Sequence, residues 1–272
     1  MDSRGVIASL FGAPRALIGM IHLDALPGTP AASQSVEALA QAAVADAEIY
    51  QNAGFHGLII ENMSDLPYLK RAVGPEVVAA MAAIGCELRR AVHLALGFQI
   101  LAGANREALA VALACGASFI RAEGFVFAHV ADEGMLESDA GELLRYRRAI
   151  GANAVHVFAD VKKKHAAHAL TADVGLAETA RAAEFFLADG VIVSGSATGR
   201  ETDPVEVAAV AEAVTVPTIV GSGVTAGNLG RYPAADAFIV GSSVKRDGLW
   251  SDPLDAKCVD EMARAFEALG TE

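Results

Sequence analysis

Eight short apolar runs recur along the chain, and each is followed by a turn and a stretch with the spacing of an amphipathic helix. The runs are almost continuously apolar, as expected for parallel strands that are buried on both faces. Eight such units in succession predict an α/β fold, the closed (β/α)8 TIM barrel, with a doubly wound open sheet as the alternative. The predicted strands are residues 16–21, 57–61, 98–102, 118–122, 155–161, 190–195, 217–221 and 237–241.

Helical patterns occupy the intervals between these runs. Two of them begin at a first-turn proline, in Gly74-Pro75 and Asp203-Pro204. No linker or change of composition divides the chain, so residues 1–272 are predicted to form a single domain. The longest connection without a pattern, residues 123–138, follows the fourth strand and should lie over the active face. The predicted helices are residues 36–53, 75–91, 106–114, 140–150, 176–188, 204–213 and 255–269, with a short one at 225–229.

Composition and charge limit which kinds of partner and which compartment fit this chain. Hydrophobic residues make up 53% and charged residues 20%, which allows a core and shows no signature of disorder. The formal net charge of −12 argues against nucleic acid and anionic membranes as general partners. No apolar run is long enough for an integral membrane segment, and residues 1–21 make a poor signal peptide. Three cysteines without CxxC spacing indicate a reducing compartment, so we expect a cytoplasmic protein. No cofactor is expected, and a homo-oligomer is left open.

The last two predicted strands run into turns rich in glycine and serine, at residues 221–225 and 241–245. In barrels, the loops after strands seven and eight commonly hold a phosphate with the help of a short helix N-terminus. Glycines let the backbone approach an anion, and exposed N–H groups bind it. Tight turns are rich in glycine anyway, but two at consecutive strand ends predict a phosphorylated small molecule as ligand. Lys245 and Arg246 either assist it or are exposed cations. The predicted phosphate-binding residues are Gly221, Ser222, Gly223, Gly241 and Ser242.

Polar side chains also follow the six earlier strands, where barrel enzymes keep their catalytic groups. We predict Glu61, Asp160, Lys164 and His165 as catalytic residues. The predicted substrate-binding residues are His22, Asn62, Asn105, Arg121, Glu123 and Ser194. Further polar residues at these ends are Asp24, Lys162, Lys163, Ser196 and Thr198.

Several of these residues have an alternative role. The lysine run at 162–164 is also compatible with a solvated surface, Glu61 with a structural pair to Arg121, and His22 with a supporting position. Lys164 either stays charged and polarises a carbonyl, or loses its proton among neighbouring lysines and forms a Schiff base. His165 and His168 have helical spacing, but no tight ligand motif accompanies them, so no metal is predicted.

Long blocks of the sequence resemble the BtpA/SgcQ family, and together they cover essentially the whole chain. These blocks are GMIHLDALPGTP (19–30), GLIIENMSDLPY (57–68), FIRAEGFVFAHVADEGMLE (119–137), ELLRYRRAIGA (142–152), ADVKKKHA (159–166), VGSGVTAGNL (220–229) and FIVGSSVKRDG (238–248).

This resemblance implies a phosphate-binding TIM barrel. The family pattern of an Asp followed by a Lys-His pair corresponds to Asp160, Lys164 and His165. Its Asn followed by an Asp corresponds to Asn62 and Asp65. The sequence departs from the family after the third strand, where QILAGAN replaces an Asn-Val-Leu-Arg-Asn-Asp stretch and retains Asn105. It also departs at Glu123, which replaces a common Asn.

The family name implies two classes of function. A cyanobacterial member is associated with thylakoid membranes and photosystem I, whereas others resemble sugar-operon enzymes. Some carry the label phosphoribosylanthranilate isomerase, but such enzymes use a cysteine at the end of strand one, where this chain has Met20-Ile21-His22. The polar strand ends favour an enzyme that isomerises, epimerises or cleaves a phosphorylated sugar or similar metabolite. The alternative is a non-catalytic assembly factor for a membrane complex.

Overall fold

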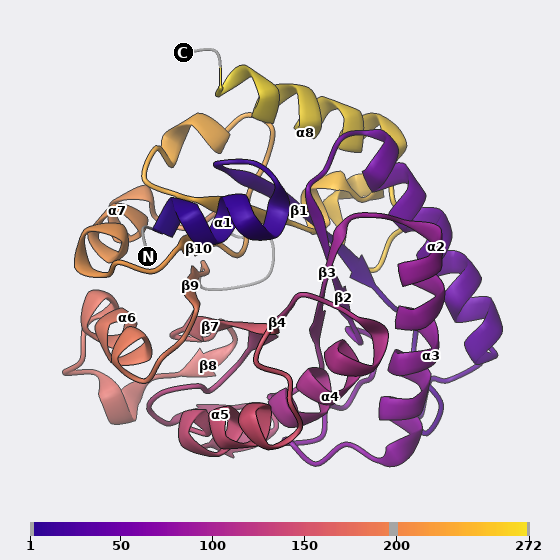
Figure 1. The fold of residues 1–272 in the computed structure, drawn as a ribbon, viewed down its shortest axis with the longest axis horizontal. Helices are drawn as coiled ribbons and strands as arrows, with labels where there is room; N and C mark the ends of the chain where they lie inside the picture. Colours follow the sequence, from indigo (N-terminus) through magenta and orange to yellow (C-terminus); the bar gives the residue numbers. More distant parts are fainter. Residues whose placement is uncertain (1–2, 196–200, 271–272) are drawn as a thin grey trace.

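The computed structural model describes residues 3–195 and 201–270, and its centre is a closed parallel barrel. Around the barrel the strands follow the order β1-β11-β10-β9-β7-β4-β3-β2, and helices surround them (Figure 1). The TIM-barrel prediction is therefore confirmed. The barrel strands are β1 (Ala16–His22), β2 (Gly57–Glu61), β3 (Ala95–Gln99), β4 (Phe119–Ala122), β7 (His156–Val161), β9 (Gly190–Val193), β10 (Thr218–Val220) and β11 (Ala237–Val240).

Most helices form where the periodicity predicts them. Ser35 caps the first of the surrounding helices, since its side chain accepts a hydrogen bond from the N–H of Ala38 at 3.2 Å. Asp203 caps another in the same way, directly before a first-turn proline. The helices around the barrel are α2 (Val36–Asn52), α3 (Pro75–Ala91), α4 (Asn105–Cys115), α5 (Ala140–Ala149), α6 (Leu176–Phe185), α7 (Pro204–Ala213) and α8 (Ala256–Ala268).

An additional helix, α1 (Ser3–Phe11), precedes the barrel and was not predicted. Its Ile7 and Phe11 are buried among side chains from inside the barrel, including Ile59 and Phe119. The rings of Phe11 and Phe119 meet edge to face with centroids 5.6 Å apart. The helix therefore closes the end of the barrel opposite the strand C-termini, which leaves only the other end open to a ligand.

The third strand lies three residues earlier than predicted, at Ala95–Gln99 instead of 98–102. Residues 92–102 are almost all apolar, so their pattern does not reveal where the strand ends. Pairing with β2 sets the register, with Leu58 beside Leu96 and Glu61 beside Gln99. The segment after Gln99 is consequently a loop and not a strand.

The connection after β4 is not irregular throughout. It contains an antiparallel hairpin of β5 (His129–Ala131) and β6 (Gly134–Leu136), and β8 (Ala166–Ala167) pairs with β5 as a third strand. Because β8 lies in the loop after β7, this small sheet connects the lysine-rich segment to the connection after β4.

The predicted helix at 225–229 is absent. Residues 225–228 form a turn, and the 3-10 helix η2 (Leu229–Arg231) follows it. The 3-10 helices η1 (Ala169–Thr171), η3 (Ser242–Val244) and η4 (Arg246–Gly248) occupy other connections.

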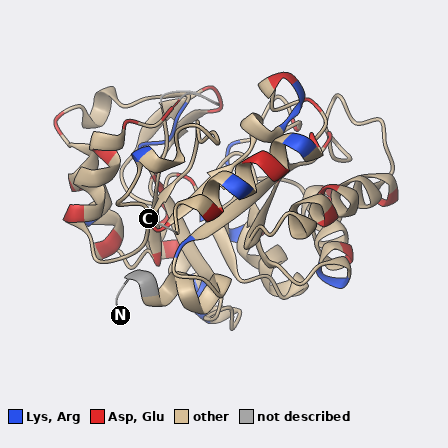
Figure 2. Cartoon of the chain, turned by 90° about the horizontal axis from the view of Figure 1, so that it is seen from above, with Lys and Arg blue, Asp and Glu red and all other residues tan. Residues whose placement is uncertain are grey.

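Charge on the outside of the molecule is mainly acidic, in line with the formal net charge of −12. Figure 2 shows Asp and Glu positions on helices on both sides of the barrel. Within residues 3–195 and 201–270, no helix combines the length and the apolar character that crossing a bilayer requires.

Candidate active site

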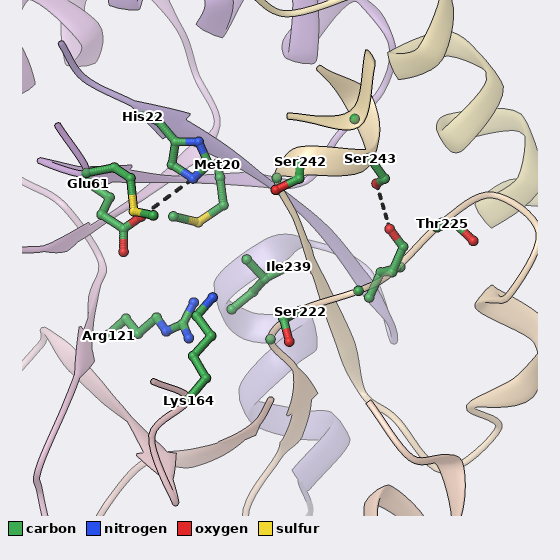
Figure 3. A pocket seen from close by; sticks show the side chains of 16 residues that line it. Met20, His22, Glu61, Arg121, Lys164, Ser222, Thr225, Ile239, Ser242 and Ser243 are labelled. Atoms are coloured by element: carbon green, nitrogen blue, oxygen red, sulfur yellow. Dashed lines mark hydrogen bonds and ion pairs between the residues drawn. The ribbon is translucent and has the colours of Figure 1, made fainter. Parts of the chain in front are cut away.

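A cavity of about 230 Å³ opens at the C-terminal ends of the barrel strands. Figure 3 shows Arg121 and Lys164 ending together on one side of it, with Glu61 and His22 above them and serines 222, 242 and 243 on the other side. The cavity therefore combines two of the predicted groups, the Gly-Ser turns and the charged strand ends. Its lining residues are Met20, His22, Glu61, Met63, Arg121, Lys164, Ile239, Gly248, residues 221–225 and residues 241–243.

The two turns offer backbone donors to the cavity. Among the described residues, no hydrogen bond is donated by the N–H groups of Gly223, Val224, Ser242 or Ser243. The Ser243 hydroxyl donates to the Val224 carbonyl at 2.6 Å and so joins the two turns. Because N–H groups without a protein acceptor at a cavity wall can bind an anion, the arrangement fits a phosphate, with only the short 3-10 helix η3 beginning at the second turn.

Glycine is required in the first turn at two places. Gly223 has a φ of +67°, which side chains rarely adopt, and Cβ at Gly221 would lie 2.4 Å from Cγ2 of Ile192. The side chain of Asn228 holds the turn by donating to the Gly223 carbonyl and accepting from the Thr225 N–H, each at 2.8 Å. The Ser222 hydroxyl accepts from the Gly195 N–H at 2.8 Å, so it has a structural contact as well.

Lys245 does not reach this cavity. Its side chain is buried, and Nζ lies 3.6 Å from Oδ2 of Asp46 on α2. Burial raises the pKa of Asp46, although Lys245 opposes this effect. Arg246 is exposed. Neither cation contacts the two turns directly. The first role considered for them from the sequence, assistance in binding the phosphate, is therefore corrected.

Arg121 pairs with Asp160 and not with Glu61. Nε and Nη2 of Arg121 each lie 2.8 Å from one carboxylate oxygen of Asp160, and both side chains are buried. This bidentate geometry occupies both oxygens of Asp160. Asp160 is therefore the counter-ion of Arg121 in this structure, which opposes its predicted role as a proton-transferring group.

We expect Asp160→Asn to lower the free energy of unfolding by about 3 kcal/mol, because it leaves the buried Arg121 charge without its partner. Urea unfolding at neutral pH measures the difference. Glu87→Gln is the matched control, since it removes an exposed ion pair with Arg90 and should change the same quantity by less than about 0.5 kcal/mol. Equal effects of the two substitutions would contradict the importance of the buried pair.

Glu61 lies at the end of β2 and is 7% exposed. Burial raises the pKa of its carboxyl, while Arg121 and Lys164 act in the opposite direction. Oε2 of Glu61 lies 3.5 Å from Nε2 of His22. Burial and the nearby Lys245 lower the pKa of His22 to about 3, so this contact involves a neutral imidazole and is not an ion pair.

Lys164 is half-buried and faces the cavity beside Arg121. Burial and the Arg121 charge lower the pKa of its ammonium, and Glu61 partly opposes them. From the sequence, Lys162 and Lys163 were the cations considered to lower the pKa of Lys164. Lys163 instead binds Glu123 and Glu133, with Nζ–Oε distances of 3.3 and 2.5 Å, and holds the β5–β6 hairpin to the end of β4.

The predicted residues Asn62, Asn105, Glu123 and Ser194 lie outside the cavity and support it. Asn62 accepts from the Leu101 N–H at 2.7 Å and donates to Asp65, so it fixes the loop after β3. Asn105 exchanges hydrogen bonds with the backbone of Glu123. Oγ of Ser194 lies 3.4 Å from Nη2 of Arg121.

The remaining polar residues lie outside the cavity. His165 lines a separate depression that begins at the lysine segment, and Nε2 of His168 is 2.8 Å from the Lys163 carbonyl. Asp24 is exposed and accepts a hydrogen bond from Gln34. In the part of the chain that the structure describes, no three His, Cys, Asp or Glu residues are placed to hold a metal ion. Ser196 and Thr198 fall outside the described residues.

Sequence reasoning missed several contributors to the site. Met20 and Met63 form its apolar wall, and Asn228 shapes the phosphate turn. Trp250 presents its carbonyl to Nδ1 of His22 at 3.2 Å. Asn at the fourth position of a Gly-rich turn is a recognisable signal, because Asn side chains commonly bind nearby backbone. A backbone carbonyl from a distant loop leaves no such signal.

The sequence matches the BtpA family over residues 13–268. The chain belongs to the BtpA family. An uncharacterized mitochondrial protein of Caenorhabditis elegans is 44% identical over 275 residues, which cover 99% of each chain. The photosystem I biogenesis protein BtpA of Synechocystis is 37% identical over 88% of this chain and 83% of its own length.

Solved structures share the fold of this BtpA-family chain. Thiamine phosphate pyrophosphorylase from Pyrococcus furiosus has a TM-score of 0.57 at 15% identity, and the match covers 94% of this chain and 96% of that one. Phosphoribosyl anthranilate isomerase from Thermus thermophilus has the same TM-score at 14% identity, covering 93% and 99%. At these identities the similarity is one of barrel fold. The three cysteines of this chain lie on α3, α4 and α8 and not at strand ends.

Proposed function

We propose that this BtpA-family protein is an enzyme that forms an imine between Lys164 and the carbonyl group of a phosphorylated sugar or similar metabolite. The observation that carries the proposal is the single cavity that contains both Lys164 and the two turns, whose N–H groups at residues 223, 224, 242 and 243 donate to no described residue. The turns would fix the phosphate, which positions the rest of the molecule against the lysine.

Lys164 suits a nucleophile better than a charged electrophile. An imine requires a neutral amine, and burial beside the Arg121 guanidinium favours that form. Its amine would attack the carbonyl carbon, and the carbonyl oxygen would take the proton that the attacking nitrogen loses, which gives a hydroxyl. That hydroxyl would leave as water with a proton from Glu61, whose raised pKa suits an acid.

The imine can serve each of the reactions predicted from the sequence. It withdraws electrons from the adjacent carbon, so a C–H or C–C bond next to it breaks and the electron pair moves into an enamine. The Glu61 carboxylate left by imine formation would accept the proton from that carbon when a C–H bond breaks. When a C–C bond breaks, it would accept the hydroxyl proton of the departing fragment, which leaves as a carbonyl compound. Isomerisation, epimerisation and aldol cleavage all proceed through this step, and the phosphate turns do not discriminate between them.

Borohydride trapping tests the proposal. The protein is incubated with a panel of phosphorylated aldoses and ketoses, the imine is reduced, and peptide mass spectrometry locates the adduct. We expect an adduct on Lys164 with one or more phosphorylated carbonyl compounds and much less with their unphosphorylated counterparts. If phosphorylated compounds raise the melting temperature but never form an adduct, the imine is wrong and the phosphate site stands.

A role in membrane-complex assembly is the second candidate, favoured by the 37% identity to the photosystem I biogenesis protein of Synechocystis. Complementation separates the two. In a Synechocystis strain that lacks its own BtpA, this chain and its Lys164→Ala variant would be expressed in parallel. Equal restoration of photosystem I by both would mean that assembly does not use the cavity.

We also propose a cytoplasmic location, because three cysteines without CxxC spacing fit a reducing compartment. The name of the worm relative places that protein in mitochondria. We expect the purified protein to stay in the supernatant when sedimented with anionic vesicles at physiological salt, because its net charge of −12 is repelled by them. Cosedimentation would instead support a membrane-associated role.

A further inference from the structure

His22 lies between two groups that determine where its proton resides. Its Nδ1 is 3.2 Å from the Trp250 carbonyl, which can only accept a hydrogen bond. Nδ1 therefore carries the proton. Since burial and Lys245 lower the pKa of His22 to about 3, the ring is neutral and Nε2 presents a lone pair.

That lone pair faces Glu61. Nε2 is 3.5 Å from Oε2, and the two side chains are only 8% and 9% exposed. A carboxylate oxygen at this largely buried place would face the imidazole lone pair without a proton between them. A protonated carboxyl would instead donate toward Nε2. The contact thus favours the protonated form of Glu61.

Glu61 and Lys164 line the same cavity and influence each other's charge. The same number of protons can be placed on them in two ways, as a carboxylate with an ammonium or as a carboxyl with an amine. These two arrangements differ only in the position of one proton, so a group that favours the carboxyl also favours the free amine.

We propose that His22 is a positioning residue that holds the proton on Glu61 and thereby leaves Lys164 as a free amine. The placement of the proton follows from the contacts of His22, whereas its use in imine formation rests on the proposed function.

The other charged groups around the pair are consistent with this arrangement. Arg121 on β4 repels an ammonium on Lys164, and the Asp160 carboxylate on β7 is already bound to Arg121. Glu123 is bound by Lys163. On the other side, Lys245 disfavours a second proton on His22. The Tyr68 hydroxyl donates to the Met63 carbonyl and so does not supply a proton to Glu61.

The experiment measures the titration of Lys164 without any substrate. Acetic anhydride acylates amines but not ammonium groups, so brief labelling over a range of pH, read by peptide mass spectrometry, gives the pKa of each lysine. The exposed Lys257 on α8 serves as an internal standard. Native protein is compared with His22→Phe, Glu61→Gln and the double variant.

We expect His22→Phe to raise the pKa of Lys164, because the proton can then pass from Glu61 to the amine. Each unit of rise lowers labelling of Lys164 at neutral pH about tenfold. In the Glu61→Gln background, no carboxyl proton is available, so the same histidine substitution should have no effect. An equal shift in both backgrounds, or no shift in either, would overturn the proposal.

A measurement on the native protein guards against variants that fail to fold. Nitrogen NMR of histidine-labelled protein distinguishes the two tautomers of His22. The signals of His22 are assigned by their absence from the spectrum of His22→Asn. We expect a protonated Nδ1 and an unprotonated Nε2 at neutral pH, and the opposite tautomer or a charged ring would refute the inference. If this result holds but borohydride trapping fails with every phosphorylated carbonyl compound, the proposed function is wrong and the proton placement stands.

Discussion

Replacing Lys164 by Ala is expected to abolish adduct formation in borohydride trapping and to lower turnover by roughly three orders of magnitude or more. The reason is that no other amine lines the cavity among the described residues. Trapping and steady-state kinetics with the compound identified in the screen measure the two effects.

The stability of the Lys164→Ala variant should change by less than about 1 kcal/mol, since the native amine is half-buried and forms no ion pair with a described residue. Lys257→Ala is the control, because it removes an exposed lysine far along the chain on α8. Native turnover in Lys164→Ala would show that the amine has no part in the chemistry. A large loss of stability would instead make the activity loss uninformative.

Gly223→Asp is expected to weaken binding of a phosphorylated ligand by roughly 100-fold or more, which corresponds to about 2.7 kcal/mol. The new carboxylate would project from a turn that lines the cavity and whose Gly223 and Val224 N–H groups donate to no described residue, and it would repel a phosphate. Calorimetric titration with the trapped compound, or with inorganic phosphate as a minimal probe, measures the change.

A matched control is available at Gly151, in the loop after α5. Its φ of +77° is close to the +67° of Gly223, and a Cβ there meets nothing within 4 Å. Gly151→Asp therefore imposes similar backbone strain away from the cavity and should leave affinity unchanged. If both variants bind phosphate as the native protein does, the turns are not the anion site.

The candidate site was predictable only in part. The Gly-Ser turns, Glu61, Arg121 and Lys164 were all identified from the sequence, because parallel strands of a barrel bring their C-terminal ends together. The partners of these residues were not. Nothing in the order of residues indicates that Arg121 binds Asp160, or that Lys163 binds Glu133 on a hairpin. Such pairs depend on the stagger between strands and on loops that fold over them.

The sequence by itself determined the barrel, since repeated apolar runs and helical periodicity are local patterns that every β/α unit carries independently. It also determined the position of the Gly-rich turns, where local backbone geometry requires glycine. Only the tertiary structure decided the register of β3, the helix α1 that closes one end, and the contacts of His22 with Trp250 and Glu61. These features depend on contacts between residues far apart in the chain. The Trp250 carbonyl lies 228 residues beyond His22, and only closure of the barrel brings the two together.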